Sequence, residues 1–158
     1  MNNHVHLILW VNKGSCLAKY IKQVNLSYFH FFKNKYGYVG HFWQNRYKSS
    51  IIDTDHYLLQ CGKYIELNPV RAGIVISPEE YRFSSYHYYA AGAHDPLITP
   101  NPVYLETPCS EEKRLQFYKE FVISSSMINS KILNSQSIIG SEDFIMKTKK
   151  GTLLGTVP

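Results

Sequence analysis

Two histidines separated by a single residue lie near the start of the chain, in the tripeptide His4-Val5-His6. Residues 4–11 alternate in the way that predicts a β-strand, and residues two apart in a strand point to the same face. Both imidazoles can therefore reach one divalent ion. The tripeptide is also compatible with two polar side chains on the exposed face of an edge strand, and by itself it favours that interpretation.

A tyrosine and an asparagine lie four residues apart in the run YIELNP, at residues 64–69. On a helix predicted from residue 53 or 54 to about 67, that spacing places Tyr64 and Asn68 on one face. The asparagine oxygen can complete a metal site beside the phenol, where an ion polarises a phosphodiester while the tyrosine oxygen attacks it. Alternatively, Tyr64 packs in a core and Asn68 ends the helix before Pro69.

Aromatic, amide and basic side chains are interleaved in the run HFWQNRYK, at residues 41–48. Aromatic rings stack on bases and cations contact phosphates, so the run predicts an interface for a single strand or a hairpin end. It is also compatible with an aromatic hairpin that closes a core. Six residues are candidate DNA contacts: Trp43, Gln44, Arg46, Lys48, Lys63 and Arg71.

The charge of the chain favours a polyanionic partner. Its 158 residues carry a formal net charge of +5, and residues 1–75, with 9 Lys/Arg and 3 Asp/Glu, account for a net of +6. Aromatic residues crowd into the same half, as expected for a nucleic-acid interface. The 3 cysteines are far apart and odd in number, which argues against a disulfide framework and fits a reducing cytoplasm. No apolar stretch is long enough to cross a membrane.

The chain is predicted to be an α+β protein with few strands. Hydrophobic periodicity predicts strands at 4–11 and 46–52, and helices at about 15–33, 53–67, 110–123 and 141–149. Residues 77–104 are expected to be loop with at most a short helix, and residues 124–137 a linker. Two strands make a poor sheet by themselves, which predicts that the chain is part of a larger fold.

Four segments, in this order and spacing, resemble the REP-associated tyrosine transposases, a branch of the single-tyrosine HUH (IS200-like) transposases. They are NHVHL at residues 3–7, FWQNRYKS at 42–49, YIELNPVRAG at 64–73 and YRFSSY at 81–86. The resemblance covers about residues 2–92, with a fainter echo in GSEDF at 140–144. YIELNPVRAG is the most specific element of the resemblance. The histidine pair is a weak signal alone but a strong one when it occurs together with the other segments.

The resemblance implies a ferredoxin-like antiparallel sheet with helices on one face. Carried over residue by residue, His4 and His6 are the metal-binding pair, Asn68 is the third ligand and Tyr64 is the nucleophile. The implied enzyme cuts and rejoins single-stranded DNA at hairpins through a 5′-phosphotyrosine link, with Mg²⁺ or Mn²⁺ as its cofactor. Histidine ligands favour manganese. The implied enzyme is a cytoplasmic, nucleoid-associated monomer or homodimer that needs no membrane.

The chain also departs from the family pattern. Family members carry a substantial stretch before the histidine strand, which here begins at residue 3, so we expect an N-terminally truncated catalytic domain over residues 1–92. Residues 93–158 are expected to be a C-terminal extension with a helix near 110–123 and a flexible tail. Two alternatives to an active enzyme are a remnant that binds structured single-stranded nucleic acid without cutting it, and a fragment that does not fold alone.

Overall fold

The computed structural model describes residues 1, 3–12, 15–53, 56–107, 110–124 and 138–154. The chain divides into two compact units, which are described separately. One unit comprises Met1–Ile8 and Ser50–Pro158, and the other comprises Leu9–Ser49. None of the helices in the described ranges is both long and apolar enough to cross a membrane.

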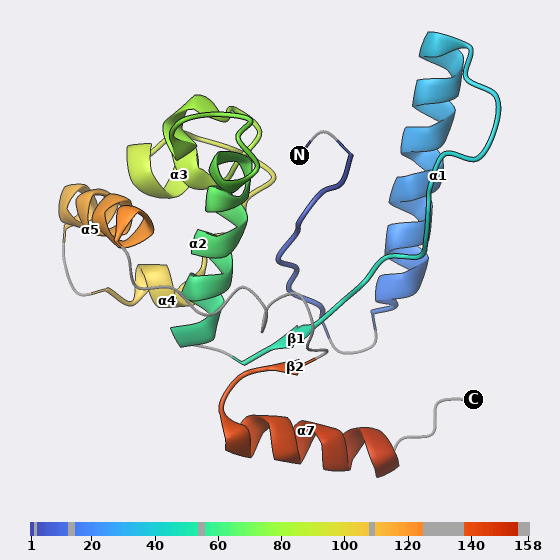
Figure 1. Cartoon of the computed structure of the whole chain (residues 1–158). Helices are drawn as coiled ribbons and strands as arrows, with labels where there is room; N and C mark the ends of the chain where they lie inside the picture. The colour runs from blue at the N-terminus through green and yellow to red at the C-terminus, as the bar shows by residue number, and fades with distance from the viewer. Residues whose placement is uncertain (2, 13–14, 54–55, 108–109, 125–137, 155–158) are drawn as a thin grey trace. The chain divides into compact units, whose positions relative to one another are not determined.

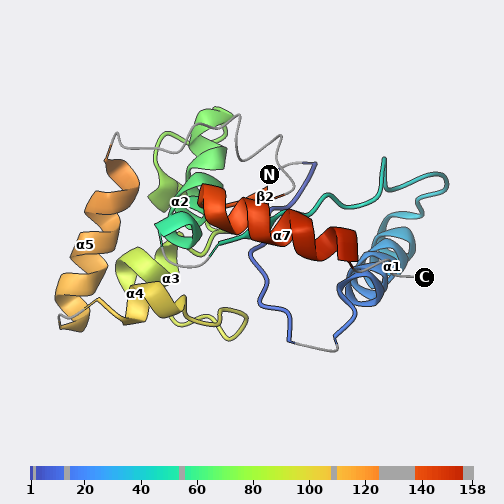
Figure 2. The same ribbon diagram turned by 90° about the horizontal axis from the view of Figure 1, so that it is seen from below.

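The larger unit is mainly helical, with a small sheet (Figures 1 and 2). Its two short strands are parallel, and Ile51 and Ile52 of β1 pair with Ile138 and Ile139 of β2. The elements in chain order are β1 (Ile51–Ile52), α2 (His56–Arg71), the 3-10 helix η1 (Pro78–Glu80), α3 (Tyr86–Ala91), α4 (Pro102–Leu105), α5 (Glu111–Ile123), β2 (Ile138–Ile139) and α7 (Glu142–Leu154).

The core of this unit is rich in tyrosine. Helices α2, α3, α4 and α5 contribute to it, and its buried members are Tyr86, Tyr104, Tyr118 and Val122. A buried phenol needs a hydrogen-bond partner. Each of these phenols has one, because Tyr104 donates to the Tyr89 carbonyl, Tyr118 to Glu66 and Tyr86 to Glu79.

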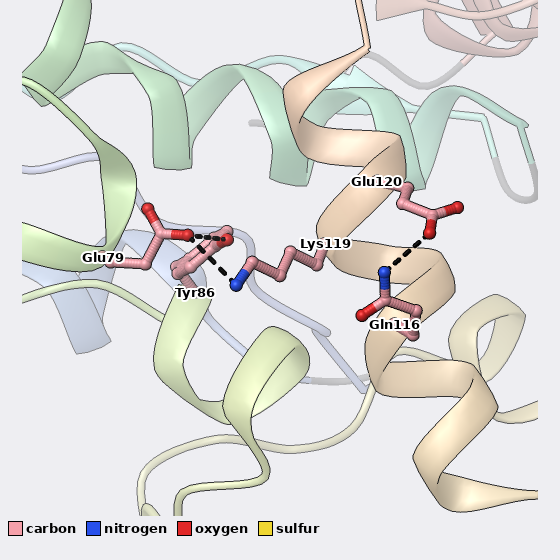
Figure 3. A network of polar contacts seen from close by, with 5 residues as sticks. All are labelled: Glu79, Tyr86, Gln116, Lys119 and Glu120. Carbon is pink, nitrogen blue, oxygen red and sulfur yellow. Dashed lines mark hydrogen bonds and ion pairs between the residues drawn. The ribbon is translucent and has the colours of Figure 1, made fainter.

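Polar contacts at the edge of the core link α5 to the preceding helices (Figure 3). The carboxylate of Glu79, in η1, accepts a hydrogen bond of 2.9 Å from Tyr86 of α3. The ammonium of Lys119, in α5, lies 3.7 Å from the same carboxylate oxygen. Within α5, the Gln116 amide donates to Glu120 one turn later, at 2.6 Å. These contacts and the shared core join the two sides of residue 92, so in the structure the predicted boundary there does not separate compact units.

Helix α2 continues past the point where the sequence predicts its end. The helix was expected to stop at about residue 67, before Pro69, but it runs to Arg71 and includes the proline. Its end is instead set by Gly73, whose φ of +65° is readily available only to glycine. The amide of Gly73 donates to the Val70 carbonyl, and that of Ile74 donates to the Pro69 carbonyl. This pair of hydrogen bonds is the Schellman motif, and it ends the helix after Pro69 rather than before it.

Asp53, one of the two predicted caps of α2, links the segments that follow the two strands. Its carboxylate accepts hydrogen bonds of 3.2 Å from both the backbone amide and the hydroxyl of Ser141. The alternative cap, Thr54, lies outside the described residues. Gly140 has to be a glycine at this junction, because a Cβ there would lie 2.6 Å from the Cβ of Asp53. The predicted helix at 141–149 is confirmed as α7, with Ser141 accepting from the amide of Phe144 at its start.

The smaller unit is one long helix and the segment that returns along it (Figure 1). Helix α1 (Leu17–Tyr36) was predicted to end near residue 33 and instead ends at Gly37, which has a φ of +62° and donates to the Lys33 carbonyl. Rings of α1 meet rings of the returning segment. Phe42 lies 4.8 Å from Phe32 and 6.0 Å from Phe29, measured between ring centroids.

The strand predictions are the least successful. Residues 4–11 form no strand, and of the predicted strand at 46–52 only residues 51–52 pair. A strand exists only where a second strand accepts its backbone hydrogen bonds, and no segment in the described ranges pairs with residues 4–11. The mixture of helix and strand agrees with an α+β protein, but the described sheet is parallel, and the antiparallel ferredoxin-like sheet is not found in the described ranges.

Two further segments differ from expectation or lie outside the structure. The stretch 77–104, expected to be loop with at most a short helix, holds η1, α3 and the start of α4. Helix α5 confirms the predicted helix at 110–123 almost to the residue. The predicted linker lies almost entirely at 125–137, outside the described residues, as does the tail after residue 154. Helix α7 reaches into the segment expected to be an unstructured tail.

Candidate functional site

One face of α2 carries a tyrosine, an asparagine and an arginine at helical spacing. Tyr64, Asn68 and Arg71 are separated by four and three residues, which is the spacing of neighbours along a helix surface. The guanidinium carbon of Arg71 lies 4.8 Å from the centroid of the Tyr64 ring, a cation–π contact. The same guanidinium donates a hydrogen bond of 3.4 Å to the Tyr64 carbonyl. The helix thus holds a phenol and a cation side by side.

The two predicted metal-binding histidines lie together and beside this phenol. The ring centroids of His4 and His6 are 4.9 Å apart, with the rings nearly perpendicular. The ring of His6 lies 6.2 Å from that of Tyr64. The structure therefore brings together His4, His6, Tyr64 and Arg71, although the two segments are far apart in the sequence. The strand expected to place both imidazoles on one face is not needed for this arrangement.

The protonation of the histidines suits a metal ligand. Nδ1 of His4 lies 2.6 Å from the side-chain oxygen of Asn3. In the tautomer in which Nδ1 donates to this oxygen, Nε2 is the nitrogen that can ligate. Burial, followed by the positive charge of His4, lowers the pKa of His6. A lowered pKa keeps more of this imidazole neutral at pH 7, and only a neutral imidazole binds a metal.

Asn68, the third predicted metal ligand, is buried on the same face of α2 as Tyr64. Its side chain is only 9% exposed, and its amide nitrogen is buried without a hydrogen-bond partner in the structure. A half-turn of the amide exchanges nitrogen and oxygen, so the unpartnered position suits a ligating oxygen equally well. Among the described residues no group of three His, Cys, Asp or Glu side chains can hold a metal. The predicted set is instead two imidazoles and the Asn68 amide, and imidazole favours the softer transition metals over magnesium.

Lys63 does not lie where a DNA contact requires it. Its side chain is 0% exposed, and its ammonium donates to the carbonyls of Phe121 and Ser124 and to the Ser124 hydroxyl, at 2.7–2.8 Å. Burial, followed by the charge of Arg71, lowers the pKa of Lys63. Its bonds instead tie α2 to the end of α5, because three oxygens there need a donor. We therefore leave Lys63 out of the DNA contacts.

Four other predicted DNA contacts belong to the smaller unit. Trp43 is half-buried and donates from its indole nitrogen to the Asn25 carbonyl at 3.2 Å. Gln44, Arg46 and Lys48 are exposed. Arg71, in the larger unit, is also exposed. These side chains keep the exposure that a nucleic-acid contact requires.

The sequence analysis assigned no role to Glu66, which is a central residue of the larger unit. Its carboxylate is 1% exposed and accepts hydrogen bonds from Ser85 at 2.8 Å and from Tyr118 at 3.0 Å. Burial raises its pKa to about 7, although both hydrogen bonds act in the opposite direction. One signal was present in the sequence: Leu59, Lys63 and Glu66 share one helical stripe, so two charged residues lie on the face that carries a core leucine.

One family model matches the N-terminal part of the chain. Residues 1–68 match the family model described as "Transposase IS200 like". The match supports the resemblance to IS200-like transposases and includes His4, His6, Tyr64 and Asn68. It covers neither Arg71 nor the rest of the chain. No curated protein and no solved structure matched.

Proposed function

We propose that the chain is a metal-dependent transposase that cleaves and rejoins single-stranded DNA at REP-like hairpins, with Tyr64 as the nucleophile. The observation that carries the proposal is the meeting of His4 and His6 with Tyr64 on one face of α2. The similarity of residues 1–68 to IS200-like transposases supports it independently.

In the proposed reaction, the phenolic oxygen of Tyr64 forms a bond to the phosphorus of one phosphodiester. The bond from phosphorus to the 3′-oxygen breaks, and that oxygen leaves with a proton as a free 3′-hydroxyl. The 5′ end of the other strand segment remains on the tyrosine as a phosphodiester. Attack by a 3′-hydroxyl reverses the step and joins strands, and no ATP is consumed because the link keeps the bond energy.

The protein groups divide this work among them. His4, His6 and Asn68 would hold a divalent ion, Mn²⁺ or Mg²⁺, which when bound supplies Lewis-acid polarisation of a phosphoryl oxygen. Arg71 stacks on the Tyr64 ring, which fixes the ring, and its exposed cation suits a phosphate oxygen of the substrate. The face of α2 that carries Tyr64, Asn68 and Arg71 would thus supply the nucleophile, one ligand and one cation from a single helix.

The test is a denaturing gel of the protein with labelled single-stranded hairpin oligonucleotides and Mn²⁺. The proposal predicts a covalent protein–DNA band that disappears with EDTA and with Tyr64→Phe. A band that persists in Tyr64→Phe would contradict it. Hairpin binding without any band would favour the alternative, a remnant that binds structured single-stranded nucleic acid but does not cut it.

A further inference from the structure

An apolar groove lies within the smaller unit, between α1 and the segment that returns along it. Its volume is about 530 Å³, within the roughly 300–1,000 Å³ that is usual for ligand pockets. Aromatic side chains form much of its wall, and two cations and an alanine also line it. The residues on which the argument rests are Ala18, Lys22, Phe29, Phe42, Trp43 and Arg46.

The aromatic wall is held in place by contacts inside the unit. Trp43 satisfies its indole nitrogen on the Asn25 carbonyl, so the ring needs no polar partner from a ligand. Phe42 packs edge-on against Trp43, with centroids 5.0 Å apart and the rings at 84°. Phe42 also contacts Phe29 from α1, at 6.0 Å. A fixed aromatic wall is the kind of surface on which a flat, unsaturated ring stacks.

The charge of this unit decides which flat ring it suits. Residues 9–49 contain no Asp or Glu, and the first carboxylate of the chain is Asp53. The same residues carry seven cations, a formal net charge of +7: Lys13, Lys19, Lys22, Lys33, Lys35, Arg46 and Lys48. A second copy of the chain would bring the same positive unit to the groove and be repelled. A polyanion with planar rings is attracted and can stack.

We propose that this groove binds one unstacked base of a single-stranded DNA segment, while Lys22 and Arg46 contact the adjacent phosphates. The site belongs to the unit that does not contain Tyr64, and it binds without cutting. The choice of DNA as the polyanion rests on the proposed function, whereas the base-stacking groove stands on the geometry and charge of the unit.

The test uses the full chain carrying Tyr64→Phe, without divalent ions, so that no cleavage is involved. Trp10→Phe is added because the chain has 2 tryptophans, and Trp10, which is 74% exposed, would otherwise contribute to the fluorescence. Trp43 fluorescence then reports on the groove alone. We expect saturable quenching by a 12-nucleotide oligothymidylate, and weaker binding by an oligonucleotide of the same length without bases.

Filling the groove tests the location. Ala18→Leu adds a helix-favouring side chain to the lining, and Gln23→Leu adds the same side chain to an exposed position of α1 outside the lining. Since stacking one base contributes a factor of about 5 to 150 in affinity, we expect Ala18→Leu to weaken binding by that factor. Gln23→Leu should bind like the parent.

A charge-matched pair keeps the proposal testable if Ala18→Leu fails to fold. Lys22→Gln and Lys19→Gln each remove one cation from α1, but only Lys22 lines the groove. We expect Lys22→Gln to weaken binding several times more than Lys19→Gln. The proposal would be overturned if Ala18→Leu bound DNA like Gln23→Leu and Lys22→Gln bound it like Lys19→Gln. It would also be overturned if the chain bound RNA more tightly than DNA, or if the chain self-associated and Ala18→Leu abolished that self-association. Because cleavage plays no part, a failed covalent-band experiment would leave this result unaffected.

Discussion

The two faces of α2 carry polar side chains in different surroundings: one face packs into the core and the other carries the candidate site. On one face, Lys63 and Glu66 are buried, and their charged groups are occupied by hydrogen bonds to Phe121, Ser124, Ser85 and Tyr118. On the other face, Tyr64 lies beside His6 and Arg71, and Asn68 keeps an amide nitrogen without a partner. The comparison teaches that adjacent residues of one motif divide between folding and chemistry, and that burial separates Lys63 and Glu66 from the exposed Arg71.

The largest expected effect on chemistry comes from removing one hydroxyl from the second face. Tyr64→Phe should abolish the covalent DNA adduct while preserving the ring contacts to His6 and Arg71, so the free energy of unfolding should change by less than about 1 kcal/mol. Tyr57→Phe is the matched control, because Tyr57 lies two turns earlier on α2. The adduct is followed on a denaturing gel and the stability by urea unfolding. Loss of the adduct in both variants would contradict the assignment of Tyr64.

The largest expected effect on stability comes from the buried face. Lys63→Met leaves three oxygens at the end of α5 without their cation, and hydrogen bonds to a charged group contribute about 1.5–3 kcal/mol each. We expect a loss of about 3–5 kcal/mol in the free energy of unfolding. The control is Lys119→Met, which removes a half-exposed ion pair with Glu79 and should cost less than about 1 kcal/mol. The free energies of unfolding are measured by urea unfolding. Similar losses in Lys63→Met and Lys119→Met would show that burial does not make Lys63 more important for stability than Lys119.

Glu66 makes the buried face sensitive to pH. Its pKa is raised from 4.5 to about 7 in the folded state. Below about pH 4.5 the carboxyl is protonated in both states, and between 4.5 and 7 it ionises in the unfolded state first. Its contribution to stability is therefore present at low pH and falls as the pH rises, by roughly 3 kcal/mol in total. Glu66→Gln does not titrate.

The difference in the free energy of unfolding between the natural protein and Glu66→Gln isolates the effect of Glu66 from that of the other titrating groups. Urea unfolding at pH 4.5, 5.5, 6.5 and 7.5 should show the stability of the natural protein falling relative to Glu66→Gln through this window. A difference that is constant with pH, or that changes in the opposite direction, would mean that Glu66 is ionised in the folded protein.

The smallest effect concerns Asn68. Because its amide nitrogen is buried without a partner, Asn68→Leu should leave the metal-free stability unchanged or raise it by up to about 1 kcal/mol. Mn²⁺ should raise the melting temperature of the natural protein, since a ligand that binds only the folded state stabilises it. That rise should be smaller in Asn68→Leu. Equal rises in the two proteins would remove Asn68 from the metal-binding set.

The elements whose signals are local could be predicted from the sequence. Helix α5 is set by periodicity and begins directly after Ser110, and both features are visible in the sequence. The end of α2 was missed because the turn chemistry of Gly73 outweighs Pro69. The strand predicted at 4–11 does not form, because a strand depends on a distant pairing partner that the sequence does not reveal. Local spacing made His4, His6 and Tyr64 candidates and the family resemblance assigned their roles; the structure brings the three together.

The burial of individual charges could not be predicted in the same way. Lysine is almost always exposed, and Lys63 was accordingly predicted to be a DNA contact. Only the position of the carbonyl groups at the end of α5 makes its burial favourable. Glu66 is a similar case, because its two hydroxyl donors, Ser85 and Tyr118, come from distant parts of the chain.

The central claim is that one tyrosine among the 13 of the chain forms the bond to DNA. Mass spectrometry of the covalent complex, after digestion with nuclease and trypsin, tests it most directly. The tryptic peptide YIELNPVR, residues 64–71, contains a single tyrosine. The account predicts a nucleotide phosphate on Tyr64 in this peptide. A nucleotide phosphate on a tyrosine in any other peptide would contradict it.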